Sequence, residues 1–69
     1  MTPRELKENW KLSYTRLAVF LCRDQRTAER YCIEGAEVPE MVLGYCWFLN
    51  QWFLLNGVTP PPFIFAPTN

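Results

Sequence analysis

The 69-residue sequence contains no histidine, and its three cysteines, Cys22, Cys32 and Cys46, are ten and fourteen positions apart. Without histidine, the chain lacks the side chain that most often acts as a general acid or base near neutral pH. The cysteines form no Cys-x-x-Cys pair of the kind that is typical of zinc sites, and their odd number favours reduced thiols in a cytosolic protein. We therefore expect no enzyme, no cofactor and no metal. A site of three thiolates is the one metal alternative.

No charged side chain follows Glu40, and the seven basic and seven acidic residues give a net charge of zero. A chain without net positive charge has no general attraction to nucleic acid or to anionic lipid, so we expect no direct nucleic-acid binding. A helix-turn-helix that uses residues 39–56 as its recognition helix is also excluded, because this segment has almost no polar side chain to face a groove.

Neither glycine nor a further proline occurs between Pro3 and Gly35, so the composition does not interrupt a helix there. Thr2 is a favoured N-cap residue, and Glu5 stands where a capping box has its carboxylate. Gly35 is a natural helix end. Because apolar residues recur in steps of three, four and seven, the pattern predicts one amphipathic helix over about 3–34, roughly 48 Å long.

Two stretches inside this segment depart from a simple amphipathic pattern. Leu17–Cys22 is apolar on every side, which indicates that partners cover it on two sides. The polar run Arg23–Thr27 interrupts the apolar face. A kink would explain that run, but a continuous helix with a solvated turn is the interpretation that we favour.

A second, shorter helix is predicted over about 39–56, between Pro39 and Gly57. It is apolar on nearly all sides, and the short connector before it favours an antiparallel arrangement with the first helix. The prolines after Gly57 favour an extended tail over 58–69. The sequence therefore predicts a single all-α domain, residues 1–69, built as a helical hairpin with an extended proline-rich tail.

The predicted helices differ in length, so residues 3–16 would overhang the second helix by roughly 21 Å. Almost half of the sequence, 49%, is hydrophobic, which is more than one small hairpin can bury. We therefore expect a homodimeric helical bundle, with the tail as a further cover for the overhang. The expected interface residues are Leu17, Val19, Phe20, Leu21, Trp47, Phe48 and Trp52.

Basic residues at a seven-residue spacing form the main candidate for binding a different protein. In one continuous helix, Arg16, Arg23, Arg26 and Arg30 would lie along a single stripe. The arginine fork suits carboxylates and phosphates, although a solvated helix face would show the same pattern. Trp10 and Tyr14, on the overhang, complete the predicted partner-binding set.

The chain as a whole resembles the small quorum-sensing anti-activator proteins that Pseudomonas phages encode. The resemblance rests on the opening TPRELKENWKLSYTRLAVFLC, the aromatic helix YCWFLNQWFLL and the PPPFIF segment. It implies a compact helical dimer in the cytoplasm of the host bacterium. It further implies binding to a LasR-type acyl-homoserine-lactone receptor, which blocks activation of transcription, and to the type IV pilus assembly ATPase.

The sequence therefore favours a non-enzymatic phage inhibitor that binds host proteins. One alternative is a small lysis or toxin-like protein that inserts Met41–Leu55 into a membrane, although this stretch is shorter than the roughly 20 residues that a bilayer core requires. A structural or assembly component of a phage particle is the other alternative.

Overall fold

The computed structural model describes residues 1–62, and in this part of the chain it contains four helices and no strand. The predicted all-α class is confirmed at this level. The helices are α1 (Pro3–Trp10), α2 (Tyr14–Leu21), α3 (Gln25–Tyr31) and α4 (Glu40–Asn56). The predicted tail 58–69 falls largely outside the described residues, because only its first five positions belong to them.

Three short helices occupy the segment in which the sequence predicts a single helix over 3–34, and that prediction is wrong. The first break follows Lys11, whose left-handed backbone (φ 52°, ψ 46°) ends α1, and the second follows Cys22 (φ 57°, ψ 39°), which ends α2. Each new helix then begins at a polar cap. The Ser13 hydroxyl accepts a hydrogen bond from the Arg16 backbone N–H at 3.1 Å, and the Asp24 carboxylate accepts one from Thr27 N–H at 3.4 Å.

The breaks are favourable because they let one short chain surround a core. A left-handed conformation costs a non-glycine residue on the order of 1–2 kcal/mol, but a straight rod would leave much of its apolar surface in water. Broken into three, the segment places apolar residues of α1 and α2 against α4 and buries Ala28 of α3 in the same core. The buried core consists of Leu6, Leu12, Leu17, Ala18, Phe20, Leu21, Ala28, Cys46, Leu49 and Phe53.

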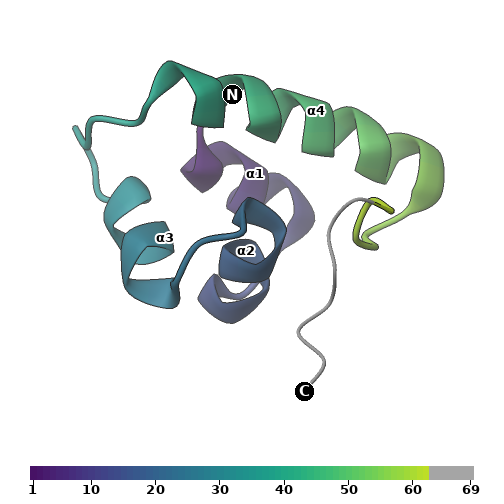
Figure 1. Ribbon diagram of the computed structural model, residues 1–69, viewed down its shortest axis with the longest axis horizontal. Helices are drawn as coiled ribbons and strands as arrows, with labels where there is room; N and C mark the ends of the chain where they lie inside the picture. The colour runs from purple at the N-terminus through teal and green to yellow at the C-terminus, as the bar shows by residue number, and fades with distance from the viewer. Residues whose placement is uncertain (63–69) are drawn as a thin grey trace.

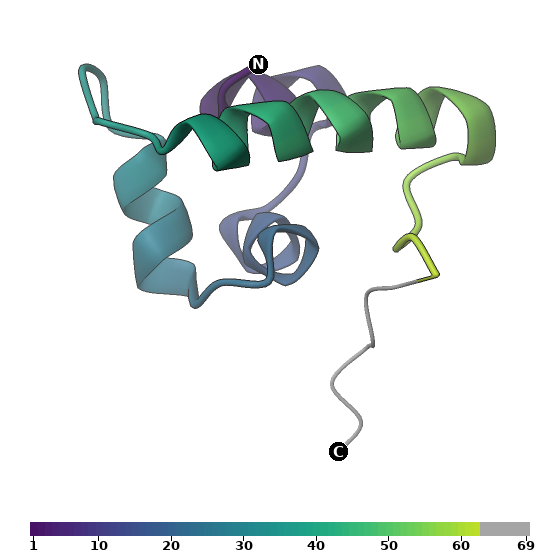
Figure 2. The same ribbon diagram turned by 45° about the horizontal axis from the view of Figure 1, so that its top comes forward.

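Helix α4 lies across one side of the molecule, and the three shorter helices lie on the other side (Figure 1). It occupies the segment predicted as the second helix, beginning after Pro39 and ending at Gly57 (φ 81°). Both α3 and α4 pack on α1 and α2, but they do so from different sides (Figure 2). The outer surfaces of α3 and α4 are therefore separate faces of the molecule.

Phe53 is the centre of the packing between α4 and the shorter helices. Its ring meets Trp10 edge-on at 5.5 Å between centroids and Phe20 at 4.9 Å. The Trp10 indole N–H also donates to the Asn50 side-chain oxygen at 2.9 Å. The predicted overhang therefore does not exist, because α1 folds back onto α4.

Candidate interaction surfaces

The outer face of α4 carries most of the large hydrophobic residues that are exposed in the described chain. Large side chains stay in water there: Met41 is 87% exposed, Leu55 83% and Leu54 63%. These positions follow the helical spacing of three and four residues, so they share one face, opposite buried Leu49 and Phe53. We call this set the α4 stripe: Met41, Gly44, Trp47, Phe48, Gln51, Leu54 and Leu55.

Within residues 1–62, nothing covers the α4 stripe at its glycine. A Cβ atom added to Gly44 would meet no atom within 4 Å. Glycine inside a helix costs about 1 kcal/mol relative to alanine, and no close packing at Gly44 among the described residues offsets that cost. No charged residue lies on the stripe, since none follows Glu40. Contiguous exposed apolar surface of this kind marks binding sites in other proteins.

The predicted dimer-interface residues differ in how far they are buried in the structure. Leu17, Phe20 and Leu21 are at most 5% exposed, because they form the core of one chain, so they are not available to a second one. Val19, Trp47 and Phe48 are exposed. Trp52 is half-buried, and its indole N–H donates to the backbone oxygen of Thr59 at 3.0 Å. Dimerisation itself stays a prediction.

The predicted arginine stripe is distributed over three elements, because the helix that would align it is broken. Arg16 on α2 donates to the Val58 carbonyl at 3.3 Å and lies over the Phe20 ring, 5.7 Å from its centroid. Arg23, in the turn after α2, donates to the carbonyl of its neighbour Cys22. Arg26 and Arg30 are exposed on α3.

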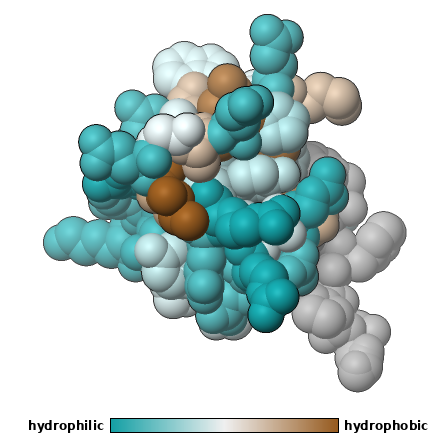
Figure 3. Space-filling view, turned by 90° about the vertical axis from the view of Figure 1, so that its left-hand side faces the viewer, coloured by the Kyte–Doolittle hydropathy of each residue, from teal (hydrophilic) through white to brown (hydrophobic). Residues whose placement is uncertain are grey.

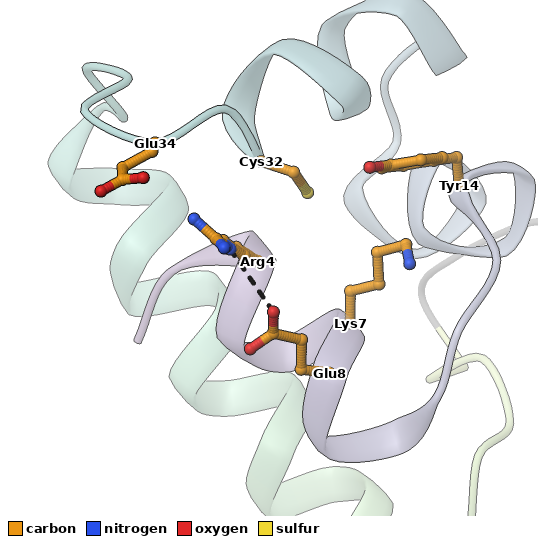
Figure 4. A pocket seen from close by; sticks show the side chains of 6 residues that line it. All are labelled: Arg4, Lys7, Glu8, Tyr14, Cys32 and Glu34. Carbon is orange, nitrogen blue, oxygen red and sulfur yellow. Dashed lines mark hydrogen bonds and ion pairs between the residues drawn. The ribbon is translucent and has the colours of Figure 1, made fainter.

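The two aromatic residues predicted to contact a partner differ in their surroundings. Trp10 is half-buried and bonded to α4, so it is not the exposed overhang residue that the sequence predicts. Tyr14 is 41% exposed, and the Lys7 ammonium lies 4.6 Å from its ring centroid. Figure 4 shows Lys7 on α1 and Tyr14 at the start of α2 on the same wall of a surface hollow.

This hollow, of about 330 Å³, is lined by charged groups of both signs and by one thiol. Arg4 forms an ion pair with Glu8 at 3.4 Å, the dashed line in Figure 4, and Glu34 lies on the far side. Burial raises the pKa of the Cys32 thiol, with smaller opposing contributions from Lys7 and Arg4. Because the thiolate is the reactive form of cysteine, this environment does not activate Cys32 as a nucleophile.

The other two cysteines are also free thiols. Cys46 is in the core, and burial raises its pKa to about 12. Cys22 lies beside Tyr45, whose pKa is raised mainly by burial and to a smaller extent by this thiol. Among residues 1–62, no three histidine, cysteine or acidic side chains come together in a way that would hold a metal ion.

A smaller groove, of about 220 Å³, separates the end of α2 from the start of α4. Its walls are mostly apolar, and Met41 of the α4 stripe forms part of them. The sequence analysis missed this groove because it combines residues that only the fold brings together. Its lining residues are Leu21, Arg23, Met41, Val42 and Tyr45.

None of the helices that residues 1–62 form is both long enough and apolar enough to cross a bilayer.

No protein-family model matches this chain, and no curated protein or solved structure is significantly similar to it.

Proposed function

We propose that this chain is a non-enzymatic inhibitor that acts by binding other proteins, and that the α4 stripe is its protein-binding surface. The observation that carries the proposal is the exposure of Trp47, Leu54 and Leu55 on a helix whose opposite face forms the core. A partner that covered each of these side chains fully would contribute about 1.5–3 kcal/mol per residue.

In the free protein, the proposed occupant of the stripe is a second copy of the chain. Two stripes without charge can approach closely, and Gly44 leaves space for a neighbouring helix because nothing else in residues 1–62 fills that space. The proposed targets are those that the resemblance implies: a LasR-type quorum-sensing activator and the type IV pilus assembly ATPase. By occupying a surface of each target, the small protein would prevent its normal assembly without any chemical step.

Light scattering after size exclusion tests the dimer first. The wild-type protein is expected to have the mass of two chains, and Leu54→Ser combined with Leu55→Ser is expected to weaken the dimer on the order of 100-fold or more. A matched control is Ile33→Ser, which removes an apolar side chain that is 63% exposed but lies outside the stripe. A monomeric wild-type protein would contradict the second copy as occupant.

A pull-down with a purified LasR-type activator and a purified pilus ATPase then tests the targets. Wild-type protein and the Ile33→Ser control should retain both, whereas the Leu54→Ser, Leu55→Ser double variant should lose them. If the wild-type protein retained neither target, the proposed inhibition of these two proteins would be wrong. Circular dichroism of each variant controls for loss of the fold.

A further inference from the structure

Helices α2 and α3 have the arrangement of a helix-turn-helix. Eight residues of α2 and seven of α3 are joined by the three-residue turn Cys22–Asp24. This motif joins two crossing helices by a turn of three to four residues, often with glycine in it. Here Cys22 adopts the left-handed conformation that glycine provides elsewhere (φ 57°). Figure 2 shows α2 nearly end-on and α3 from the side, so the two helices cross.

The packing also agrees with a three-helix unit of this type. Ala28 on α3 is fully buried, and α3 packs against both α1 and α2 but not against α4. Its opposite side is therefore left to solvent. The exposed residues on this outer face of α3 are Gln25, Arg26, Glu29 and Arg30. Figure 3, which views the molecule from this side, shows a mostly hydrophilic surface.

The amide of Gln25 is held in place at the junction of the two helices. The Thr15 hydroxyl on α2 donates to Gln25 Oε1 at 2.9 Å, and Gln25 Nε2 donates to Glu29 Oε2 at 2.9 Å. An amide has two lone pairs and two N–H donors, so one of each is left. Glutamine uses one lone pair and one N–H of its amide to recognise N6 and N7 of adenine in the major groove.

Two arginines, Arg26 and Arg30, lie beside this amide, and among residues 1–62 Arg30 attracts the Asp24 carboxylate, which is the smallest of the influences that lower the pKa of Asp24. Neither Arg26 nor Arg30 forms an ion pair or donates a side-chain hydrogen bond there. Arginine recognises O6 and N7 of guanine with its fork, the commonest specific contact to a base.

The zero net charge hides a separation of charge between the two parts of the fold. Between Lys11 and Arg30 there are five basic and two acidic residues, whereas the rest of the chain has two basic and five acidic ones. The positive part comprises Lys11, which ends α1, together with α2, the turn and α3. The sequence analysis excluded a helix-turn-helix only for the case in which residues 39–56, now α4, form the recognition helix. It did not consider the pair α2 and α3.

We propose that α2 and α3 form a helix-turn-helix that binds duplex DNA, with the outer face of α3 in the major groove. Gln25, Arg26 and Arg30 contact base edges, and Arg23 and Lys11 contact phosphates of the backbone. This site is separate from the α4 stripe, so the proposal goes beyond the protein-binding function and does not depend on it. It reverses the expectation of no direct nucleic-acid binding.

The first experiment is selection of the full chain against a library of duplex DNA with a random central region, read by sequencing. An enriched sequence is expected, and its binding to a fluorescent 25-bp duplex should weaken as salt rises. With two phosphate contacts, from Arg23 and Lys11, the logarithm of the binding constant should fall with a slope of about −2 against the logarithm of salt concentration.

Arg26→Ala is the decisive variant, with Arg4→Ala as its matched control. Arg26→Ala should weaken binding to the selected duplex about 10- to 100-fold and relax the preference at one base pair. Arg4→Ala removes the same charge from α1, where that residue pairs with Glu8, and should change binding by no more than about 2-fold. Glu29→Gln, which removes a negative charge from the α3 face, should increase affinity for every duplex tested.

Three outcomes would overturn the proposal. Selection at 50 mM salt could enrich no sequence while circular dichroism shows folded protein. Arg4→Ala could weaken binding as much as Arg26→Ala, which would show diffuse electrostatic attraction instead of groove recognition. Finally, the wild-type chain could fail to bind the duplex while Arg26→Ala lost a protein target in the pull-down, which would assign the α3 face to an acidic protein surface.

Discussion

The two parts of this molecule on either side of the 32–39 connector use opposite means to define their helices. In the first part, polar side chains cap short helices, and each helix buries one face. In the second part, α4 has no side-chain cap and almost no polar face, yet it is the longest helix. The comparison shows that local hydrogen bonds set where the helices of the first part begin, whereas tertiary packing decides which side of α4 is core.

The largest expected effect separates the two faces of α4. Phe53→Ala removes a ring that is 2% exposed between Trp10 and Phe20, and it should lower the free energy of unfolding by about 3–5 kcal/mol. Leu55→Ala, on the stripe, should change the stability of the isolated chain by about 0.5 kcal/mol or less. Urea unfolding at low protein concentration measures both. Equal losses would mean that both faces of α4 are buried in one chain.

A cap variant tests the corresponding claim for the first part of the chain. Ser13→Ala removes the acceptor for the Arg16 backbone N–H at the start of α2 and should cost about 1 kcal/mol. Thr15→Ala is a control of similar size on the same helix, whose hydroxyl makes no capping bond. If urea unfolding gave Ser13→Ala the stability of wild type, packing alone would account for the break between α1 and α2.

The smallest expected effect is a loss of stability in acid that arises from carboxylates in the first part of the chain. The Thr27 hydroxyl and backbone N–H donate to the Asp24 carboxylate, which lowers its pKa. A carboxyl group whose pKa is lower in the folded state than in the unfolded state stabilises the protein at pH values above its unfolded pKa of about 4. This contribution is lost as the pH falls through the folded pKa. The thermal midpoint should therefore fall between pH 5 and pH 2.

Asp24→Asn provides the control for this acid dependence, since asparagine still caps a helix but does not titrate. Its thermal midpoint should fall less steeply with acid than that of wild type. Glu5, whose pKa is lowered by its hydrogen bond from the Thr2 backbone N–H, contributes in the same direction and is unchanged in this variant. An identical pH profile for both proteins would contradict the role of Asp24.

The breaks in the first segment show what sequence patterns missed and why. Ser13 and Asp24 are both favoured N-cap residues, so each was a visible signal for a new helix. The residues that end the preceding helices, Lys11 and Cys22, gave no such signal, because neither is the glycine or asparagine expected at a left-handed position. Their backbone conformation is imposed by the packing of α1 and α2 on α4 and of α3 on α1 and α2.

The candidate surfaces divide in the same way. The apolar character of 39–56 was visible in the sequence, but the choice of Leu55 as exposed and Phe53 as buried was not, because apolar side chains cover both faces. The spacing of the four arginines, three of them seven residues apart and Arg26 between the last two, placed them together only if the helix was continuous. The fold instead places Arg26 and Arg30 on α3 next to Gln25, which Thr15 on another helix holds.

The sequence by itself determined the helical class of the described chain, the position of α4 and the lack of charge after its first residue, Glu40, because proline, glycine and charge act locally. Only the tertiary structure decided how the first 31 residues divide into three helices and which apolar residues remain in water. The physical reason is that one short chain must surround a core. Contacts between segments far apart in sequence, such as Trp10 with Phe53, outweigh the cost of two left-handed residues.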